Sequence, residues 1–326
     1  MTVLATTPDL DPDQSTAPLA GVQRQLLGAH FLLLARLLRR SGRSDYEGLA
    51  PDSQLERRIV LTLFRIEEGR VSELAFHMGH DVAQVSRAFT AMRRTGLVDR
   101  GRQREPYRLT ARGQELGQAL DAVALRRDLR LTAGLGPQQM FELAGLLGSL
   151  LHRAGLLLVE ELASAREEAE PGTYPVGAPP VEIHSRVQPL IVNLAASIGR
   201  SATAAFKRLT GVSSYEWRVL ANVAERPGLR FTDLVVHIDS DKAQVSRTLE
   251  ALTSNGLVER CRAAPGEPVR LQLTGHGHAL HDVIRTDSLR RNALLLADLS
   301  APQRERLQAY LDLLIANAME MSAELD

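Results

Sequence analysis

Three polar side chains in the first half of the sequence have the types that read the edges of DNA bases. Gln84, Ser86 and Arg87 belong to the block Ala-Gln-Val-Ser-Arg at residues 83–87, and an identical block recurs at 243–247. Arginine can donate two hydrogen bonds to guanine, glutamine can pair with adenine, and serine can bind a base or a phosphate. The candidate DNA contacts are therefore Gln84, Ser86, Arg87, Gln244, Ser246 and Arg247.

A purely structural interpretation of these residues stays open. Arg87 and Arg247 would then pair with acidic neighbours on a solvated helix face. Gln84 and Gln244 would serve only to cap their helices. The block is identical in two otherwise diverged segments, which exceeds what capping needs and favours contacts with DNA.

The two blocks are part of an internal repeat. A shift of 160 residues places Arg58 on Arg218 and His77 on His237 without a gap. Between the copies lies a proline-rich stretch, which cannot continue a helix and favours an extended connection. We therefore expect a disordered tail at residues 1–20, a first domain at 21–168, a linker at 169–181 and a second domain at 182–326.

Breakers and apolar periodicity predict the elements that position the first block. Helices are expected at 52–67 and 71–78, followed by a turn at Gly79 and His80. Asp81 can cap the next helix, with Gln84 three residues on as in a capping box. The second copy repeats this pair as Asp241 and Gln244, so both copies are expected to begin a helix there.

The same pattern predicts how each of these helices packs and ends. An apolar stripe at Val85, Phe89 and Met92 would bury the first helix, and Val245, Leu249 and Leu252 would bury the second. Gly96 and Gly256 then stop the helices, and short strands are expected at 97–98 with 107–110, and at 257–258 with 269–274. Two short helices followed by a hairpin form a winged helix-turn-helix, whose second helix enters the major groove.

Longer helices are expected on both sides of each winged core. They leave much apolar surface outside those small cores, which must be buried against other elements. The predicted ranges are 22–40, 112–131 and 137–168 in the first copy, and 183–209, 277–297 and 302–323 in the second.

The sequence resembles the MarR (multiple antibiotic resistance regulator) family of winged-helix repressors. The resemblance is carried by residues 72–87 and 232–247, by the Gly-Leu-Val-(Asp/Glu)-Arg that follows each, and by Leu-Thr at 109–110 and 273–274. It implies a mainly α fold with small β wings, in which two winged helix-turn-helix domains are joined by an intertwined helical dimerisation-type region. Both halves of that dimer would here lie on one chain, so a monomer would act as an intramolecular pseudo-dimer.

The resemblance also implies a small-molecule effector pocket near the junction of the winged domains and the helical region. The residues on helices that line this pocket in the family are His30, Arg58, Tyr215, Trp217 and Arg218. Each of them is also compatible with an ordinary core position or a salt bridge.

Charge and wing sequence distinguish the two copies. From 55 to 112 there are twelve arginines against seven acids, a net +5, whereas from 214 to 274 eight cations meet eight acids. The first copy is expected to hold DNA more tightly, since phosphate neutralisation supplies most non-specific affinity. At the start of the block, Lys242 of the second copy corresponds to Val82 of the first, so the half-sites should form an imperfect palindrome.

The wing tips also differ from the family pattern. The family's Asp and Arg pair near the wing tip is not kept cleanly, and the remaining candidate wing contacts are Arg102, Arg104 and Arg262.

Several other classes of function find little support. No glycine-rich phosphate loop, serine nucleophile elbow or repeated carboxylate pair is present, so we expect neither an enzyme nor a cofactor. His276, His278 and His281 lie near Asp282, but the first copy has no match and a solvated surface explains them better than a metal site. Cys261, the single cysteine, has no partner to resolve a sulfenic acid and is expected to be inert.

The predicted function is a cytoplasmic, sequence-specific transcription regulator, a ligand-responsive repressor that binds double-stranded DNA through two non-identical helices. The first 20 residues lack the pattern of a signal peptide, and the apolar stretch 26–38 is too short to span a bilayer, so no membrane association is expected. The alternative is a ligand-binding or protein-interaction module that has kept the fold and lost operator binding.

Overall fold

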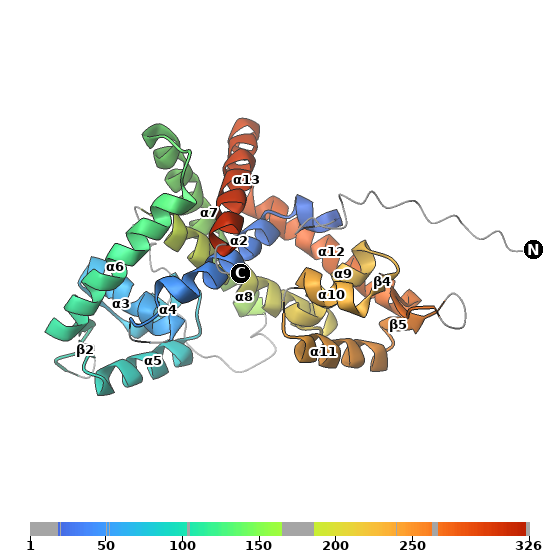
Figure 1. Ribbon diagram of the computed structural model, residues 1–326, viewed down its shortest axis with the longest axis horizontal. Coiled ribbons are helices and arrows are strands. Elements are labelled where there is room, and N and C mark those ends of the chain that lie inside the picture. Colours follow the sequence, from blue (N-terminus) through green and yellow to red (C-terminus); the bar gives the residue numbers. More distant parts are fainter. Residues whose placement is uncertain are drawn as a thin grey trace, which may run out of the picture. The chain divides into compact units, whose positions relative to one another are not determined.

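The computed structural model describes residues 19, 21–49, 51, 53–102, 105–164, 186–238, 240–262 and 267–323. The predicted linker, Arg104 and nearly all of the predicted tail lie outside these residues. Helices dominate, with two small sheets (Figure 1). The elements are η1 (Gly21–Gln25), α2 (Leu27–Asp45), α3 (Gln54–Ile66), β1 (Glu68–Gly69), α4 (Val71–His77), α5 (Val82–Arg94), β2 (Val98–Asp99), β3 (Tyr107–Leu109), α6 (Ala111–Leu131), α7 (Pro137–Ser164), α8 (Val187–Thr210), α9 (Ser214–Glu225), β4 (Leu229–Arg230), α10 (Phe231–Ile238), α11 (Lys242–Ser254), β5 (Val258–Cys261), β6 (Arg270–Leu273), α12 (Gly275–Leu295) and α13 (Ala301–Ala323).

The chain divides into two compact units that do not follow the order of the copies. One unit contains Met1–Ala29 and Ala205–Asn292, and the other contains His30–Ala204 and Ala293–Asp326. The second of these holds the first winged domain together with most of α8 and with α13, which belong to the second copy in sequence. The domain boundaries derived from the repeat therefore stay predictions, because the units are defined by packing and not by sequence order.

Each copy forms a helix-turn-helix with a three-stranded sheet. The strand order is β1-β3-β2 in the first copy and β4-β6-β5 in the second, with every pair antiparallel. The expected hairpins are thus present. The third strands, β1 and β4, were not predicted, since two residues are too few to show an alternating pattern.

The predicted apolar stripes form the two cores. Val85, Phe89 and Met92 are fully buried, and Phe89 stacks on Tyr107 of the wing with ring centroids 4.1 Å apart. In the other unit the side chains of Val245, Leu249 and Leu252 are equally buried. These contacts fix each second helix against its own wing and leave the opposite face of the helix to solvent.

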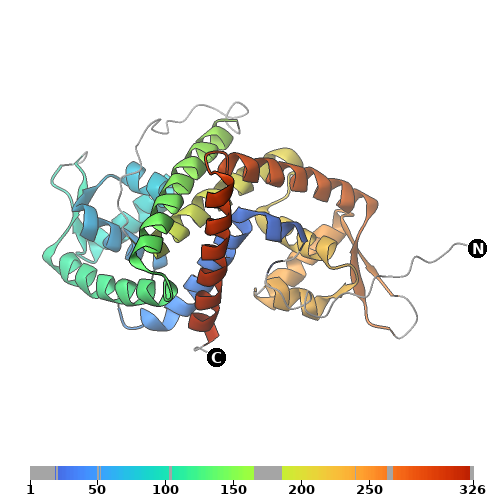
Figure 2. The ribbon, with the colours of Figure 1, turned by 90° about the horizontal axis from the view of Figure 1, so that it is seen from above.

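Helices of both copies pack together within the unit that contains the first winged domain (Figure 2). The buried Asp128 of α6 accepts hydrogen bonds from the backbone N–H groups of Val187 and Gln188, at 3.4 and 2.7 Å, and so holds the start of α8. Asn317 of α13 donates to the carbonyl of Leu131 at 2.8 Å. Removal of either polar partner would leave a buried group unpaired.

Arg127 anchors α6 to α2 in the same region. Its side chain is only 2% exposed and donates to the carbonyls of Leu38 and Ser41 at 2.8 and 3.0 Å, and it forms an ion pair with Asp45. A buried guanidinium is tolerated because both of its terminal nitrogens are paired in this way, while Nε has no hydrogen-bond partner among the described residues. Among the described residues, α7 alone has the length and apolar composition to cross a membrane, which is also the property of a buried core helix.

The turn before α5 lies directly against α8. Gly79 has a φ of +64°, and a Cβ atom at this position would lie 2.8 Å from the Cβ of Ala196 and 2.9 Å from the backbone nitrogen of Ser197. Glycine is therefore required twice, for its backbone conformation and for the close approach.

His77, Arg58 and the buried Asn193 form a polar cluster beside this turn. Arg58 Nη2 donates to Asn193 Oδ1 at 2.6 Å, and the Asn193 amide nitrogen lies 3.2 Å from His77 Nε2. Because a guanidinium only donates, the oxygen of Asn193 must face Arg58, and its NH₂ group must donate to an unprotonated His77 nitrogen. Burial and the Arg58 charge lower the pKa of His77 to about 4.

We expect Gly79→Ala to destabilise the protein by more than about 2 kcal/mol, since backbone strain adds to a clash with α8. Gly96→Ala is the matched control, because Gly96 has a φ of +70° but open space around its Cβ position. It should cost about 1 kcal/mol. Urea unfolding measures both, and equal losses would contradict the close packing of the turn on α8.

A second prediction concerns pH. The unfolded state binds a proton on His77 near pH 6.5, whereas the folded state binds it only near pH 4. Stability therefore falls as pH falls through this window, by about 2 kcal/mol between pH 7 and pH 5. His77→Gln removes the titrating group, and its unfolding free energy should lose less over the same interval. An identical pH dependence in the two proteins would refute the assignment.

Candidate functional site

The exposed face of α5 carries the three side chains of the first block. Asp81 caps the helix by accepting from the backbone nitrogens of Ala83 and Gln84, at 2.6 and 3.4 Å. Gln84, Ser86 and Arg87 are all exposed. The predicted cap is confirmed, but the Gln84 side chain does not complete a capping box, because its oxygen lies 3.3 Å from His80 Nδ1.

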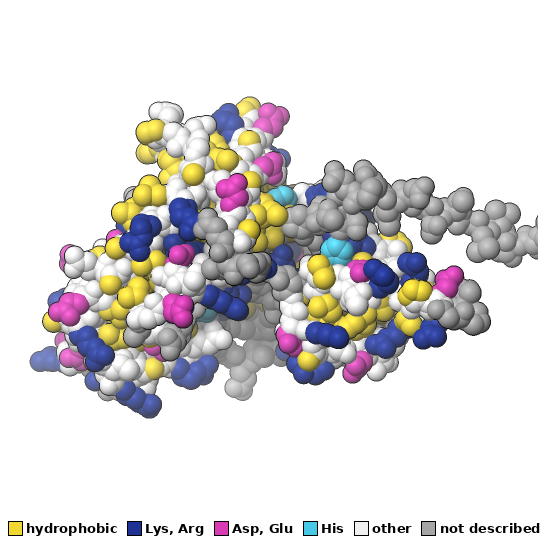
Figure 3. All heavy atoms as spheres, in the orientation of Figure 1, with side chains coloured by type: hydrophobic (Ala, Val, Ile, Leu, Met, Phe, Trp, Pro, Cys, Tyr) yellow, Lys and Arg dark blue, Asp and Glu magenta, His cyan; other side chains and the backbone are white. Residues whose placement is uncertain are grey.

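The exposed face of α11 carries the second block with one change in bonding. Asp241 accepts from the Gln244 backbone nitrogen at 3.0 Å, and Lys242, Gln244 and Arg247 are exposed. Ser246 is half-buried and donates to Glu250 at 2.9 Å. Figure 3 shows Lys and Arg side chains gathered over α5, whereas cationic and acidic side chains alternate over α11.

Neither Arg87 nor Arg247 forms an ion pair or a side-chain hydrogen bond within the part of the chain that the structure describes. The purely structural interpretation, in which acidic neighbours satisfy these arginines, therefore has no support in the geometry. Two guanidinium groups at the start of exposed helices remain available for an external acceptor.

The wings offer fewer available groups. Arg102 and Arg262 are exposed, and Arg104 lies outside the described residues. Other wing arginines are occupied within the protein: Arg270 donates to the carbonyl of Gly228 at 3.0 Å, and Arg108 pairs with Glu68. The predicted wing contacts stay predictions.

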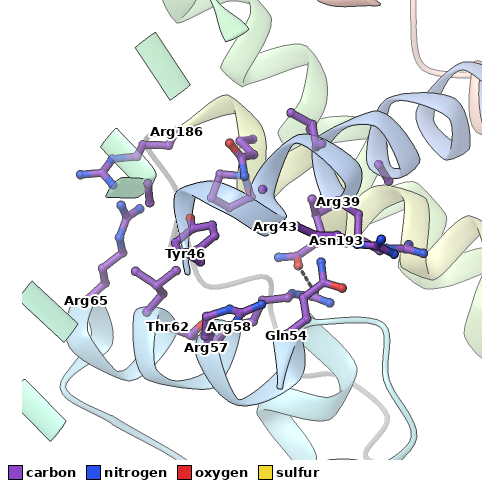
Figure 4. A pocket seen from close by; sticks show the side chains of 18 residues that line it. Arg39, Arg43, Tyr46, Gln54, Arg57, Arg58, Thr62, Arg65, Arg186 and Asn193 are labelled. Atoms are coloured by element: carbon purple, nitrogen blue, oxygen red, sulfur yellow. Dashed lines mark hydrogen bonds between the residues drawn. The ribbon is translucent and has the colours of Figure 1, made fainter. Parts of the chain in front are cut away.

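A cavity of about 360 Å³ lies beside the first winged domain, between α2, α3 and the start of α8 (Figure 4). Its size suits a small organic ligand. None of the described lining residues is acidic. Six of them are arginines: Arg39, Arg43, Arg57, Arg58, Arg65 and Arg186.

Two of these arginines share one carboxylate from outside the lining, which compensates one of their two positive charges. Asp121 of α6 pairs with Arg65 at 2.9 Å and with Arg186 at 2.8 Å. Arg58, in contrast, has only neutral hydrogen-bond partners, and burial together with the charge of Arg39 lowers its pKa to about 10. The cavity thus holds positive charge at neutral pH in surroundings that disfavour it, and an anion would relieve that cost.

A chain of hydrogen bonds connects this cavity to α5. Arg58 Nη1 lies 2.8 Å from His80 Nε2, and His80 Nδ1 lies 3.3 Å from the Gln84 side-chain oxygen. Since Arg58 only donates, His80 Nε2 must accept, and the proton of the neutral ring sits on Nδ1 and is donated to Gln84. Arg200 of α8 donates to the His80 carbonyl at 2.8 Å and fixes the backbone of the turn.

The second copy has a different arrangement at the equivalent positions. Ser240 replaces His80, and its hydroxyl accepts from Arg218 at 2.8 Å. The Arg218 guanidinium also lies 4.9 Å from the ring centroid of Tyr215. The hydrogen-bonded chain from Arg58 through His80 to Gln84 is thus a feature of the first copy.

Of the five predicted pocket residues, Arg58 lines the cavity. His30 is buried near Gln308, at 3.5 Å, while Tyr215, Trp217 and Arg218 belong to the other unit. There Trp217 stacks on His281 with ring centroids 5.0 Å apart, so His281 packs against an aromatic ring.

The residues considered for metal binding or redox chemistry form no site among the described residues. No group of three potential metal ligands gathers there. Cys261 lies on a wing strand, and its sulfur is 3.6 Å from the Arg270 carbonyl oxygen.

Sequence reasoning missed most of the cavity arginines. At the shift of 160 residues, Arg39 corresponds to Gly199 and Arg43 to Thr203, so the repeat does not identify these arginines as shared residues. Arg186 follows the linker and pairs with a residue 65 positions earlier. Only the folded arrangement brings these charges together.

Comparisons with known proteins point to one family. The MarR family model matches residues 209–267, which run from the end of α8 through α11 to the wing of the second copy. No curated protein matches the chain.

Solved structures of the same family show partial likeness. A MarR/EmrR family transcriptional regulator from Acinetobacter sp. ADP1 is 21% identical, with 39% of this chain and 90% of that chain covered and a TM-score of 0.36. The MepR–DNA complex of S. aureus is 18% identical, with 40% and 88% covered and a TM-score of 0.33. PcaV of Streptomyces coelicolor, solved with its natural ligand, is 22% identical, with 39% and 90% covered and a TM-score of 0.32. The match to the MarR family model thus covers residues 209–267, in the second half of the chain.

Proposed function

We propose that the protein is a cytoplasmic, ligand-responsive transcriptional repressor that binds an imperfect palindrome in double-stranded DNA through α5 and α11. The observation that carries this proposal is the pair of exposed helices with identical Gln-Val-Ser-Arg blocks, each capped by Asp and held by a wing. Their exposed arginines and glutamines have the chemistry of major-groove readers.

The proposal includes a single-chain pseudo-dimer of two MarR-like domains. It is supported by the packing of α8 and α13 with α6 and α7 in one unit, since these helices come from different copies. An intramolecular partner has an effective concentration in roughly the millimolar range when the linker is short. The second DNA-binding helix would therefore always be present beside the first.

The cavity beside the first winged domain is the proposed effector site. Its excess of arginines favours a small anion, for example an aromatic carboxylate. An anion that bonds to Arg58 would withdraw the donor that fixes the His80 tautomer. The neutral ring would then be free to carry its proton on Nε2, His80 would no longer donate to the Gln84 side chain, and the affinity for DNA would fall.

The arginines of the two blocks test DNA binding. Arg87→Ala and Arg247→Ala should each weaken binding to a selected operator by about 1–3 kcal/mol, because each would lose a bidentate contact to a base. We expect the larger loss for Arg87, whose copy carries the net positive charge. Fluorescence anisotropy at fixed salt measures both, with Arg126→Ala on the exposed face of α6 as the control.

The outcomes separate the two functions considered for this chain. Equal losses for Arg87→Ala and Arg247→Ala would contradict the asymmetry of the two readers. If the unmodified protein showed no saturable binding to any genomic fragment, the alternative of a ligand-binding or protein-interaction module would replace the repressor. The neutral second winged domain is the observation that favours that alternative.

Salicylate, a small aromatic carboxylate, is a suitable probe for the cavity. Calorimetric titration should show binding that Arg58→Gln weakens at least about tenfold, since a charge-assisted contact is lost. Arg126→Gln should bind salicylate normally. His80→Ser, which installs the residue of the second copy, should leave salicylate binding intact and reduce its effect on DNA affinity. Unchanged binding in Arg58→Gln would remove Arg58 from the effector site.

A further inference from the structure

The reading faces of α5 and α11 differ in charge at one position beside the conserved arginine. Glu250 in α11 stands where α5 has Thr90, and both side chains are exposed. Glu250 follows Arg247 by three residues, so the helical period places the two on the same face of α11. No ion pair between them is present among the described residues.

The carboxylate of Glu250 is held in place by the block itself. Ser246 donates its hydroxyl proton to Glu250 Oε1 at 2.9 Å. In α5 the Thr90 hydroxyl turns back to the carbonyl of Ser86 at 3.0 Å. The same serine is thus used to orient an acceptor in one copy only.

An oriented carboxylate is selective among base edges because it can only accept hydrogen bonds. In the major groove, guanine presents two acceptors and thymine an acceptor and a methyl group, and both disfavour an anion. Adenine offers an amino donor beside its N7 acceptor, whereas cytosine offers its N4 amino group without such a neighbour. Cytosine is therefore the base that Glu250 fits best.

We propose that Glu250, oriented by Ser246, is a specificity-determining residue that selects cytosine in the half-site read by α11. The inference rests on the proposed DNA-binding function and deepens it. The half-site read by α5 lacks this requirement, since Thr90 carries no charge. Beside the difference between Lys242 and Val82, the palindrome then has a second imperfection, which is located at one base pair and has Glu250 as its cause.

Selection of bound sequences from a random double-stranded pool tests the assignment. The unmodified chain should enrich a two-part motif with cytosine at one position of a single half-site. Glu250→Thr should abolish that enrichment, and Glu250→Gln should shift it toward adenine, the base that glutamine pairs with. Replacing the cytosine in the selected site should cost the unmodified protein about tenfold in affinity and cost Glu250→Thr almost nothing.

Thr90→Glu is the reciprocal variant, because Ser86 is already present to orient the new carboxylate. It should create a cytosine preference in the other half-site. Unchanged cytosine enrichment in Glu250→Thr would overturn the inference. So would an equal gain in affinity for all sequences, which would show that Glu250 acts only through charge repulsion. If the unmodified chain enriches no motif, the proposed DNA-binding function itself fails.

Discussion

Arg58 has hydrogen-bond donors and no acceptor, and this chemical constraint orders the whole junction between the first winged domain and the helices around it. Its bond to Asn193 fixes which way that amide points, and the amide in turn requires an unprotonated His77 nitrogen. Its bond to His80 fixes a second tautomer, whose proton faces Gln84. One guanidinium thus determines the proton positions of two histidines and the orientation of a candidate base reader.

The same cluster couples segments that are far apart in the sequence. Asn193 and Arg200 belong to α8, which lies beyond the proline-rich stretch, yet both bond to residues of the first winged domain. Gly79 allows this contact, because any side chain there would meet the backbone of α8. A movement of α8 would therefore reach the turn before α5 without passing through flexible intermediates.

Much of the reading surface could be predicted from the sequence, because the repeat isolates it. Asp81, Gly96 and the stripe from Val85 to Met92 use local rules of capping, helix ending and periodicity, which need no knowledge of the tertiary structure. The short strands β1 and β4 could not be predicted, since they exist only through pairing with β3 and β6. The cavity was not predicted for a related reason: its arginines come from α2, from α3 and from Arg186 just before α8, and only packing assembles them.

The sharing of helices also has a consequence for synthesis of the chain. The unit that holds the first winged domain is completed by α13, which leaves the ribosome after the whole first copy and most of the second. Asn317 and Tyr310 of α13 bond to partners near the ends of α6 and α7 that were made more than 160 residues earlier. Such non-local closure slows folding. The apolar faces of α6 and α7 that α13 covers therefore stay exposed until nearly the entire second copy has been translated. During that interval the nascent first half is open to aggregation through this surface.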